Sequence, residues 1–276
     1  MEKAWKTIID GEDRLWNLDI REIWNYRSLI WVLFQKNYSL QYKQTILGPL
    51  WMIFSVIINT GVFTLVFGYV GHISSDGIPY FLFCMTGNVI WNLFAFSFNS
   101  NIRVLIDNAY LFGKVYFPRL IVPISNSLLC LGRCLMQLVV LLIVLVGFII
   151  KGEVVFTGLN IVWIFPLLLL TAILGTSLGL IISALTVKYR DFEHLTGALV
   201  SMLMFVSPVL YPTSSLSPVV KRLLYFNPMS SFVEAFRLCI TGTGNLYVPG
   251  MIYSIVFTIV ITAVALFCMV VSKRII

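Results

Sequence analysis

Residues 120–150 read LIVPISNSLLCLGRCLMQLVVLLIVLVGFII and contain a single charged residue, Arg133. A helix of this length is about 46 Å long at about 1.5 Å per residue, whereas the hydrocarbon core of a bilayer is about 30 Å thick. Every backbone polar group must be paired inside lipid, so an apolar run of this length predicts a membrane-spanning helix.

Five further apolar runs occur along the chain. They cover residues 50–70, 78–98, 159–187, 195–211 and 251–271. The run 159–187 contains Pro166, and the run 195–211 is shorter and meets Pro208 near its end. The sequence therefore predicts an all-α membrane protein with six transmembrane helices.

The composition excludes several other classes of protein. Of the 276 residues, 59% are hydrophobic and only 11% are charged, whereas a soluble domain has about 25% charged residues. This excludes a soluble enzyme, a disordered chain and a secreted disulfide scaffold. The five cysteines show no metal-ligand spacing, and the sequence contains no phosphate-binding loop of the form G-x-x-x-x-G-K-[ST]. We expect no cofactor in this chain.

The basic residues are unevenly distributed between the two sides of the predicted bundle. The net charge is +7, and outside the spans 14 Lys and Arg fall on one side and four on the other. This bias predicts that both termini are cytoplasmic and accounts for the charge without a nucleic-acid partner. In this topology His72 and His194 lie on opposite sides and cannot share a metal. The first residues, MEKAWKTIIDGEDR, do not resemble a signal peptide.

The first 49 residues form a cytoplasmic segment in this prediction, followed by the six-span domain at 50–276. Asp19 followed by Glu22 indicates a capping box for a helix at 19–38. The apolar side of that helix includes Trp24 and Trp31, which is typical of a helix lying in the membrane interface. Packing against other protein would give the same stripe and remains an alternative.

Two further segments outside the spans are longer than simple connections. The loop 101–119 exceeds the usual length of links between helices and mixes charged with apolar residues. This pattern predicts a docking element, although an ordinary interfacial loop could look the same. The segment 212–250 has two apolar patches too short to cross a membrane, which predicts two re-entrant helices or, alternatively, a surface subdomain.

Arg133 and the aromatic residues are the remaining candidates for function within the spans. Arg133 is either functional or structural, reaching the interface or pairing with another helix, and the sequence does not separate these possibilities. Aromatic residues are 14% of the chain; most are expected to pack, but some could line a conduit in which sugar rings stack. The channel-lining candidates are Trp51, Phe54, Phe63, Phe67 and Phe205.

Three motifs resemble one known family. YKQTILGPLW at 42–51 leads into the first span, KVYFPR at 114–119 lies between the second and third spans, and Asn227-Pro228-Met229 precedes the last span. In this order they resemble the permease subunits of ABC-type polysaccharide exporters for O-antigen and teichoic acid. The third motif is the least specific. The capsule-exporter branch usually lacks the Tyr-Phe-Pro-Arg element.

The resemblance implies partners and a location. The permease would be a homodimer in the bacterial inner (plasma) membrane, joined to two separate ATP-binding subunits that hold ATP and Mg. It would export a lipid-pyrophosphate-linked glycan, in contact with membrane lipids. Two alternatives stay open: a permease of the same fold exporting a small lipid or drug, and a membrane-embedded transferase acting on lipid-linked sugars.

The resemblance also implies roles for individual residues. Coupling to the ATPase, by contact or by holding the coupling helix, falls to Asp107, Lys114, Tyr116, Phe117 and Arg119. A gate helix at the membrane surface carries Trp24, Arg27, Trp31, Lys36 and Lys43, whose cations could meet the pyrophosphate or other anionic lipids. The outer re-entrant segment carries Asn227, Pro228, Glu234 and Arg237, the last two spaced to form an ion pair.

Overall fold

All regular elements in the described part of the chain are helices. The computed structural model describes residues 20–114, 117–154, 160–189, 191–244 and 246–272, and no strand occurs among them. The helices are α1 (Ile20–Asn25), α2 (Arg27–Tyr42), α3 (Leu50–Phe63), η1 (Thr64–Val70), α4 (Tyr80–Asn99), α5 (Val104–Asp107), α6 (Ala109–Lys114), α7 (Ile121–Ile150), α8 (Ile161–Thr186), α9 (Asp191–Val206), η2 (Thr213–Ser215), α10 (Pro218–Leu224), α11 (Pro228–Thr241) and α12 (Val248–Ser272).

Five helices in the described residues are long and apolar enough to cross a membrane. They are α3 continued by η1, α4, α7, α8 and α12. Five of the six predicted spans therefore correspond to a spanning helix. The predicted span 195–211 corresponds to α9, which has 16 residues and ends at Val206. It is shorter because Pro208 disfavours helical backbone at the residue before it.

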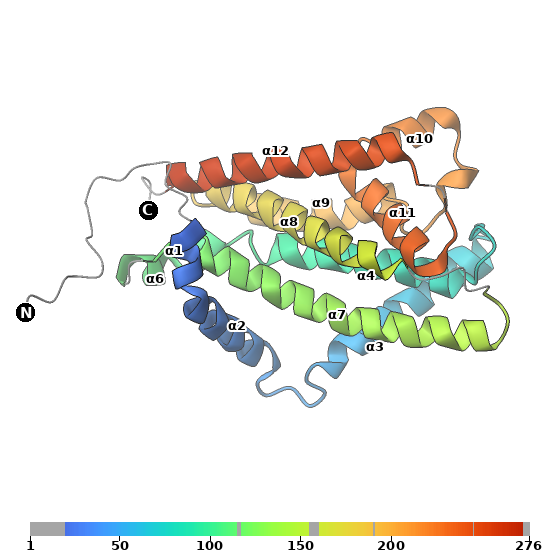
Figure 1. The fold of residues 1–276 in the computed structure, drawn as a ribbon, viewed down its shortest axis with the longest axis horizontal. Coiled ribbons are helices and arrows are strands. Elements are labelled where there is room, and N and C mark those ends of the chain that lie inside the picture. The colour runs from blue at the N-terminus through green and yellow to red at the C-terminus, as the bar shows by residue number, and fades with distance from the viewer. Residues whose placement is uncertain (1–19, 115–116, 155–159, 190, 245, 273–276) are drawn as a thin grey trace, which may run out of the picture.

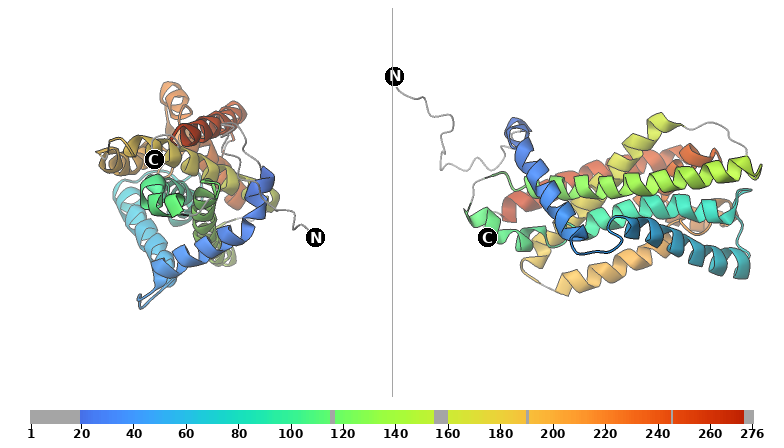
Figure 2. Two further views of the ribbon diagram at one scale, coloured as in Figure 1. Left: turned by 90° about the vertical axis from the view of Figure 1, so that its left-hand side faces the viewer. Right: turned by 90° about the horizontal axis from the view of Figure 1, so that it is seen from below.

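The long helices form one bundle with distinct ends (Figure 1). We call the end that carries α1 and α6 the α6 end, and the opposite end, which carries α10 and α11, the α11 end. The predicted N-terminal helix at 19–38 is wrong as a single element. The helix is interrupted at Tyr26, which separates α1 from α2, and α2 continues to Tyr42. Seen end-on, α2 runs across the bundle rather than parallel to it (Figure 2).

The helix α4 is the centre of the bundle. In its apolar window 78% of residues are buried, against 17% for α3 with η1. The main core includes Phe83 and Leu93 of α4 and Phe232 and Phe236 of α11, all fully buried. Without a hydrophobic force between helices in lipid, close packing of this kind is what holds a membrane bundle together.

Glycines let α8 approach α4 closely. A Cβ atom built on Gly175 would lie 2.7 Å from the Phe94 carbonyl oxygen, and one on Gly179 would lie 2.6 Å from that of Phe98. The four-residue spacing places both glycines on one face of α8, as in the small-xxx-small pattern of membrane helix pairs. The α4–α8 contact is therefore made backbone to backbone.

A second, smaller core lies at the α6 end. It joins Leu33 of α2, Val104 and Leu105 of α5, and Met269 of α12. Since these residues come from three helices far apart in the sequence, this core ties α2 and the 101–119 loop to the bundle.

Candidate functional site

The connection between α4 and α7 is anchored at its start. Val104 and Leu105 of α5 are buried, and the Leu105 amide donates to the Ser183 hydroxyl of α8 at 3.2 Å. The Asn108 side chain donates to the Val104 carbonyl at 2.9 Å. The buried side chains and the bond to Ser183 fix α5 to the bundle, so the next helix starts from a rigid base.

By contrast, α6 projects from the bundle and exposes one side (Figure 1). Tyr110 is 68% exposed, and the Lys114 ammonium lies against its ring, 4.0 Å from the centroid. The opposite side is held by Phe112, whose ring centroid lies 5.6 Å from that of Phe117 and 5.4 Å from Cζ of Arg119. The helix therefore presents Tyr110 and Lys114 outward on a packed aromatic support.

An exposed ion network joins this loop to the start of α9. Arg103 Nε lies 3.1 Å from Asp107 Oδ1, and Nη1 donates to both carboxylate oxygens of Glu193, at 2.9 and 2.7 Å. The hydrogen bond to Glu193 and, to a lesser extent, the one to Asp107 raise the pKa of Arg103 above its ordinary value. In the described residues these are the only ion pairs. Exposed ion pairs contribute little stability, so the network chiefly links α5 to the start of α9.

The structure separates the predicted coupling residues by environment. Asp107 and Lys114 are exposed, whereas Phe117 is buried, which fits holding the helix rather than contacting a partner. Tyr116 lies outside the described residues. The sequence did not single out Arg103 or Glu193, because opposite charges in two separate loops give no sign of pairing.

The predicted gate helix residues lie along α1 and α2, except Lys43, which directly follows α2. Trp24 and Trp31 are 67% and 53% exposed although both are apolar, and the Arg27 guanidinium lies 5.6 Å from the Trp24 ring. Lys36 and Lys43 are exposed. The two Trp therefore point away from the core, as an interfacial position would require.

An aromatic row continues along α2. Trp31, Phe34, Tyr38 and Tyr42 follow one another with ring-centroid distances of 5.0, 6.2 and 4.7 Å. Their spacing of three or four residues places them on one side of the helix. On the side toward the bundle, Leu33 is buried.

The channel-lining candidates fall into two groups. Trp51 and Phe54 on α3 and Phe205 on α9 are about half exposed. Phe63 and Phe67 pack against the core, with their ring centroids 6.2 Å apart. Only the first group therefore presents aromatic surface outside this chain's own core.

The start of α11 is fixed by Asn227 and Pro228. The Asn227 side-chain oxygen accepts from the Met229 amide at 3.1 Å, which caps the helix, and its amide donates to Ser207 at 2.8 Å. Pro228 stands at the first helical position, where its missing N–H costs nothing. The Asn-Pro motif thus joins the start of α11 to the end of α9.

Glu234 and Arg237 are both buried, but the expected ion pair between them is wrong. Glu234 accepts hydrogen bonds from the Thr213 hydroxyl and from the Tyr225 hydroxyl, the latter at 2.7 Å. Burial raises the pKa of Tyr225, and the Glu234 charge raises it further. Each of the two charged residues has its own partners, so they stabilise different parts of the α11 end.

Arg237 connects α11 to α4 and to the segment after α9. Its Nη2 donates to the Pro208 carbonyl at 2.9 Å, and Cζ lies 3.6 Å from the Phe83 ring centroid. A more distant contact joins Nε to the Thr86 hydroxyl at 3.4 Å. Since a buried guanidinium must be satisfied, this geometry fixes where the chain turns after α9.

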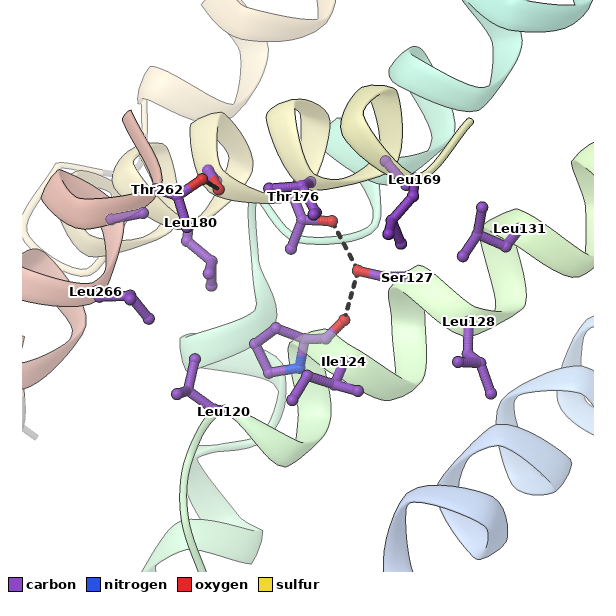
Figure 3. A pocket seen from close by; sticks show the side chains of 15 residues that line it. Leu120, Ile124, Ser127, Leu128, Leu131, Leu169, Thr176, Leu180, Thr262 and Leu266 are labelled. Carbon is purple, nitrogen blue, oxygen red and sulfur yellow. Dashed lines mark hydrogen bonds between the residues drawn. The ribbon is translucent and has the colours of Figure 1, made fainter. Parts of the chain in front are cut away.

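An apolar groove of about 270 Å³ lies between α7, α8 and α12 (Figure 3). Its polar groups are already paired: the Ser127 and Thr176 hydroxyls are 2.7 Å apart, and those of Ser177 and Thr262 are 3.0 Å apart. Leucines such as Leu128 and Leu169 form most of the rest. The groove offers an apolar surface and no reactive group.

No metal-ligating cluster occurs among the described residues, since no three His, Cys, Asp or Glu side chains gather there. The described cysteines are free, and all but Cys268 are buried. The notable features are therefore surfaces: the exposed side of α6, the exposed aromatics of α2, and those of α3 and α9.

Comparisons with known proteins point in one direction. The sequence model of the family described as ABC-2 type transporter matches residues 28–241. Two Klebsiella pneumoniae proteins described as O-antigen export system permease protein RfbA are 26% and 25% identical over 238 and 245 residues, 83% and 87% of this chain and 89% and 91% of theirs. A Myxococcus xanthus protein of the same description is 28% identical over 221 residues, 79% of this chain and 82% of its own.

Proposed function

Because the chain belongs to the ABC-2 type transporter family, we propose that this multi-pass membrane permease forms the channel of an ATP-driven exporter of lipid-linked polysaccharide. The described relatives are O-antigen export permeases, which supports a polysaccharide as the substrate class. The permease would sit in the bacterial inner membrane and move its substrate out of the cytoplasm.

The observation that carries this proposal is the arrangement of α6. It projects from the α6 end with Tyr110 and Lys114 exposed, while Phe112 and Phe117 support it from behind. A short helix held rigidly at one end of a bundle can transmit movement from a partner that grips it. That partner would be one of two ATP-binding subunits. Each would hold ATP and Mg, for which this chain has no binding motif.

The proposed topology has six spans and both termini in the cytoplasm. In it α9 is the fifth span, with 16 residues and about 24 Å of length, extended by the chain that leads to Pro212. The charge bias between the two sides supports this orientation. The α6 end would then face the cytoplasm, where the ATP-binding subunits are.

The segments at the two ends would act as gates. On the cytoplasmic side α1 and α2 would lie in the membrane interface, with Trp24 and Trp31 toward lipid. At the α11 end, α10 and α11 would be re-entrant helices; α11 is buried among α4, α8 and α12, which supplies the protein cover that such a helix needs.

Two copies of the chain would enclose the conduit. Most of α3 is exposed although it is apolar, and α9 exposes Phe205. In this proposal a second copy of the chain, rather than lipid, covers part of these surfaces. Trp51, Phe54 and Phe205 would then offer aromatic faces to sugar rings, which bind weakly at many points and so allow movement.

Co-purification tests the proposal. The chain is expressed with the ATPase encoded beside it, the complex is isolated, and ATP hydrolysis is measured with and without a lipid-linked glycan. We expect a complex with two copies of each subunit and stimulation of hydrolysis by the glycan. Stimulation by small lipids or drugs but not by glycan would instead favour a small-molecule exporter of the same fold.

A further inference from the structure

Arg133 lies at a defined depth in α7. The helix has 30 residues, about 45 Å, and so is longer than the hydrocarbon core of a bilayer. Lys151 follows it at the α11 end and is exposed. Counting back from Lys151, about 20 residues cross the hydrocarbon, which places Arg133 at the opposite headgroup boundary. This is the depth at which lipid phosphates lie.

The surroundings of Arg133 match that depth. Its Cζ lies 5.0 Å from the Phe96 ring centroid, so the guanidinium packs on an aromatic face of α4. Burial raises the pKa of the Tyr42 hydroxyl, whereas the charge of Arg133 and its hydrogen bond to that hydroxyl act in the opposite direction. Since Tyr42 is the last residue of α2, the guanidinium lies where the end of α2 meets the bundle.

The guanidinium still has hydrogen-bonding capacity. Its Nε is buried and makes no hydrogen bond to any described residue. No described carboxylate lies within ion-pair distance of the Arg133 guanidinium. Both ion pairs between described residues belong to Arg103. A partly buried cation with an unpaired donor and no counter-charge is costly unless an anion compensates it.

Tyr42 has a similar unused capacity. Its hydroxyl donates to the sulfur of Met52 on α3, with an O···S distance of 3.3 Å. A thioether is a weak acceptor, so a stronger acceptor would take this hydrogen bond. Tyr42 and Arg133 therefore lie side by side on different helices, and neither forms an ion pair with a described carboxylate.

We propose that Arg133 and Tyr42 bind a phosphate group of a membrane lipid at the junction of α2, α3 and α7. Guanidinium suits phosphate because it offers parallel N–H donors to two oxygens. The lipid chains would lie along the apolar surface of the bundle, and the headgroup would reach the α6 end. The assignment of this headgroup to the pyrophosphate of an exported glycan carrier rests on the proposed function; the site itself does not.

The test is a binding titration on the full chain in maltoside detergent, which contains no phosphate. Undecaprenyl pyrophosphate is added, and binding is measured by native mass spectrometry. Arg133→Gln should weaken binding at least tenfold, or about 1.4 kcal/mol. Arg133→Lys should lose less, because it keeps the charge without the paired donors. Lys151→Gln, at the other end of the same helix, is the matched control and should bind as the unmodified chain does.

Unchanged affinity in Arg133→Gln would overturn the site. If that variant has a lowered melting temperature, Tyr42→Phe replaces it, with an expected loss of several-fold and the same criterion. Millimolar inorganic pyrophosphate should displace the lipid; no displacement would contradict recognition of the headgroup.

Further outcomes separate this site from the proposed function. Binding of undecaprenyl pyrophosphate that ignores Arg133 removes the site and leaves the export proposal intact. Arg133-dependent binding of phosphatidylglycerol, with none of undecaprenyl pyrophosphate, would support the phosphate site and contradict the pyrophosphate-linked carrier.

Discussion

Replacing Gly179 by Ala tests whether α4 and α8 are packed backbone to backbone. The added Cβ would lie 2.6 Å from the Phe98 carbonyl oxygen and 2.9 Å from Cβ of Asn101. Ordinary contacts of a Cβ atom begin at about 3.4 Å, so the two helices would have to separate by about 0.8 Å. Both neighbouring atoms are backbone or fixed by it, and neither can rotate away.

The cost follows from the rigidity of both helices. Inserting one methyl group into a well-packed interface typically costs about 1–3 kcal/mol. Gly175→Ala should behave similarly, because its Cβ would lie 2.7 Å from the Phe94 carbonyl oxygen. The double variant should cost less than the sum, since one separation of the helices relieves both contacts.

Thermal unfolding of the purified chain in detergent measures the effect. Gly132→Ala in α7 is the matched control, because nothing lies within 4 Å of the Cβ it would add, and its melting temperature should be unchanged or slightly higher. The reasoning is refuted if Gly179→Ala melts at the same temperature as the unmodified chain, or if Gly132→Ala is destabilised to the same extent.

Three further changes address the other surfaces. Lys114→Glu should reverse the charge on the exposed side of α6 and reduce glycan-stimulated ATP hydrolysis several-fold at constant expression, whereas Lys221→Glu on α10 should not; equal activity of both would remove the docking role. Phe54→Ala should slow export in a cell-surface glycan assay more than it lowers the amount of assembled complex, and parallel losses would indicate a packing role. Arg237→Met should leave the Pro208 carbonyl without its donor and lower the free energy of unfolding by about 1–3 kcal/mol, seen as a lower melting temperature. Unchanged stability would show that this hydrogen bond does not stabilise the fold.

The sequence predicted the elements of the fold well where apolar length was the signal. Five of the expected spans match long helices closely, because lipid leaves a long apolar run no alternative to helix. The expectation was less accurate at residues 195–211, where Pro208 shortens α9, and at 19–38, where the helix is interrupted at Tyr26. Local breaks depend on a few backbone angles, which apolar periodicity does not report.

The candidate site was predictable only in outline. The 101–119 loop stood out by its length and mixed composition, and Lys114 is exposed there. The distinction between Tyr110, which faces outward, and Phe117, which is buried, was not accessible. Both are aromatic residues in one polar loop, and only the packing of Phe117 on Phe112 separates them.

The sequence by itself determined that this chain is a helical membrane protein and where its five long apolar helices lie, because these properties depend on local composition and length. The tertiary structure decided which residues meet. Arg103 pairs with Glu193, and Arg237 bonds to a carbonyl near the end of α9 rather than to Glu234. Arg133 lies beside Tyr42 although 91 positions separate them. Such contacts depend on how whole helices pack in three dimensions. Local patterns of composition and spacing in the sequence do not reveal which distant residues meet.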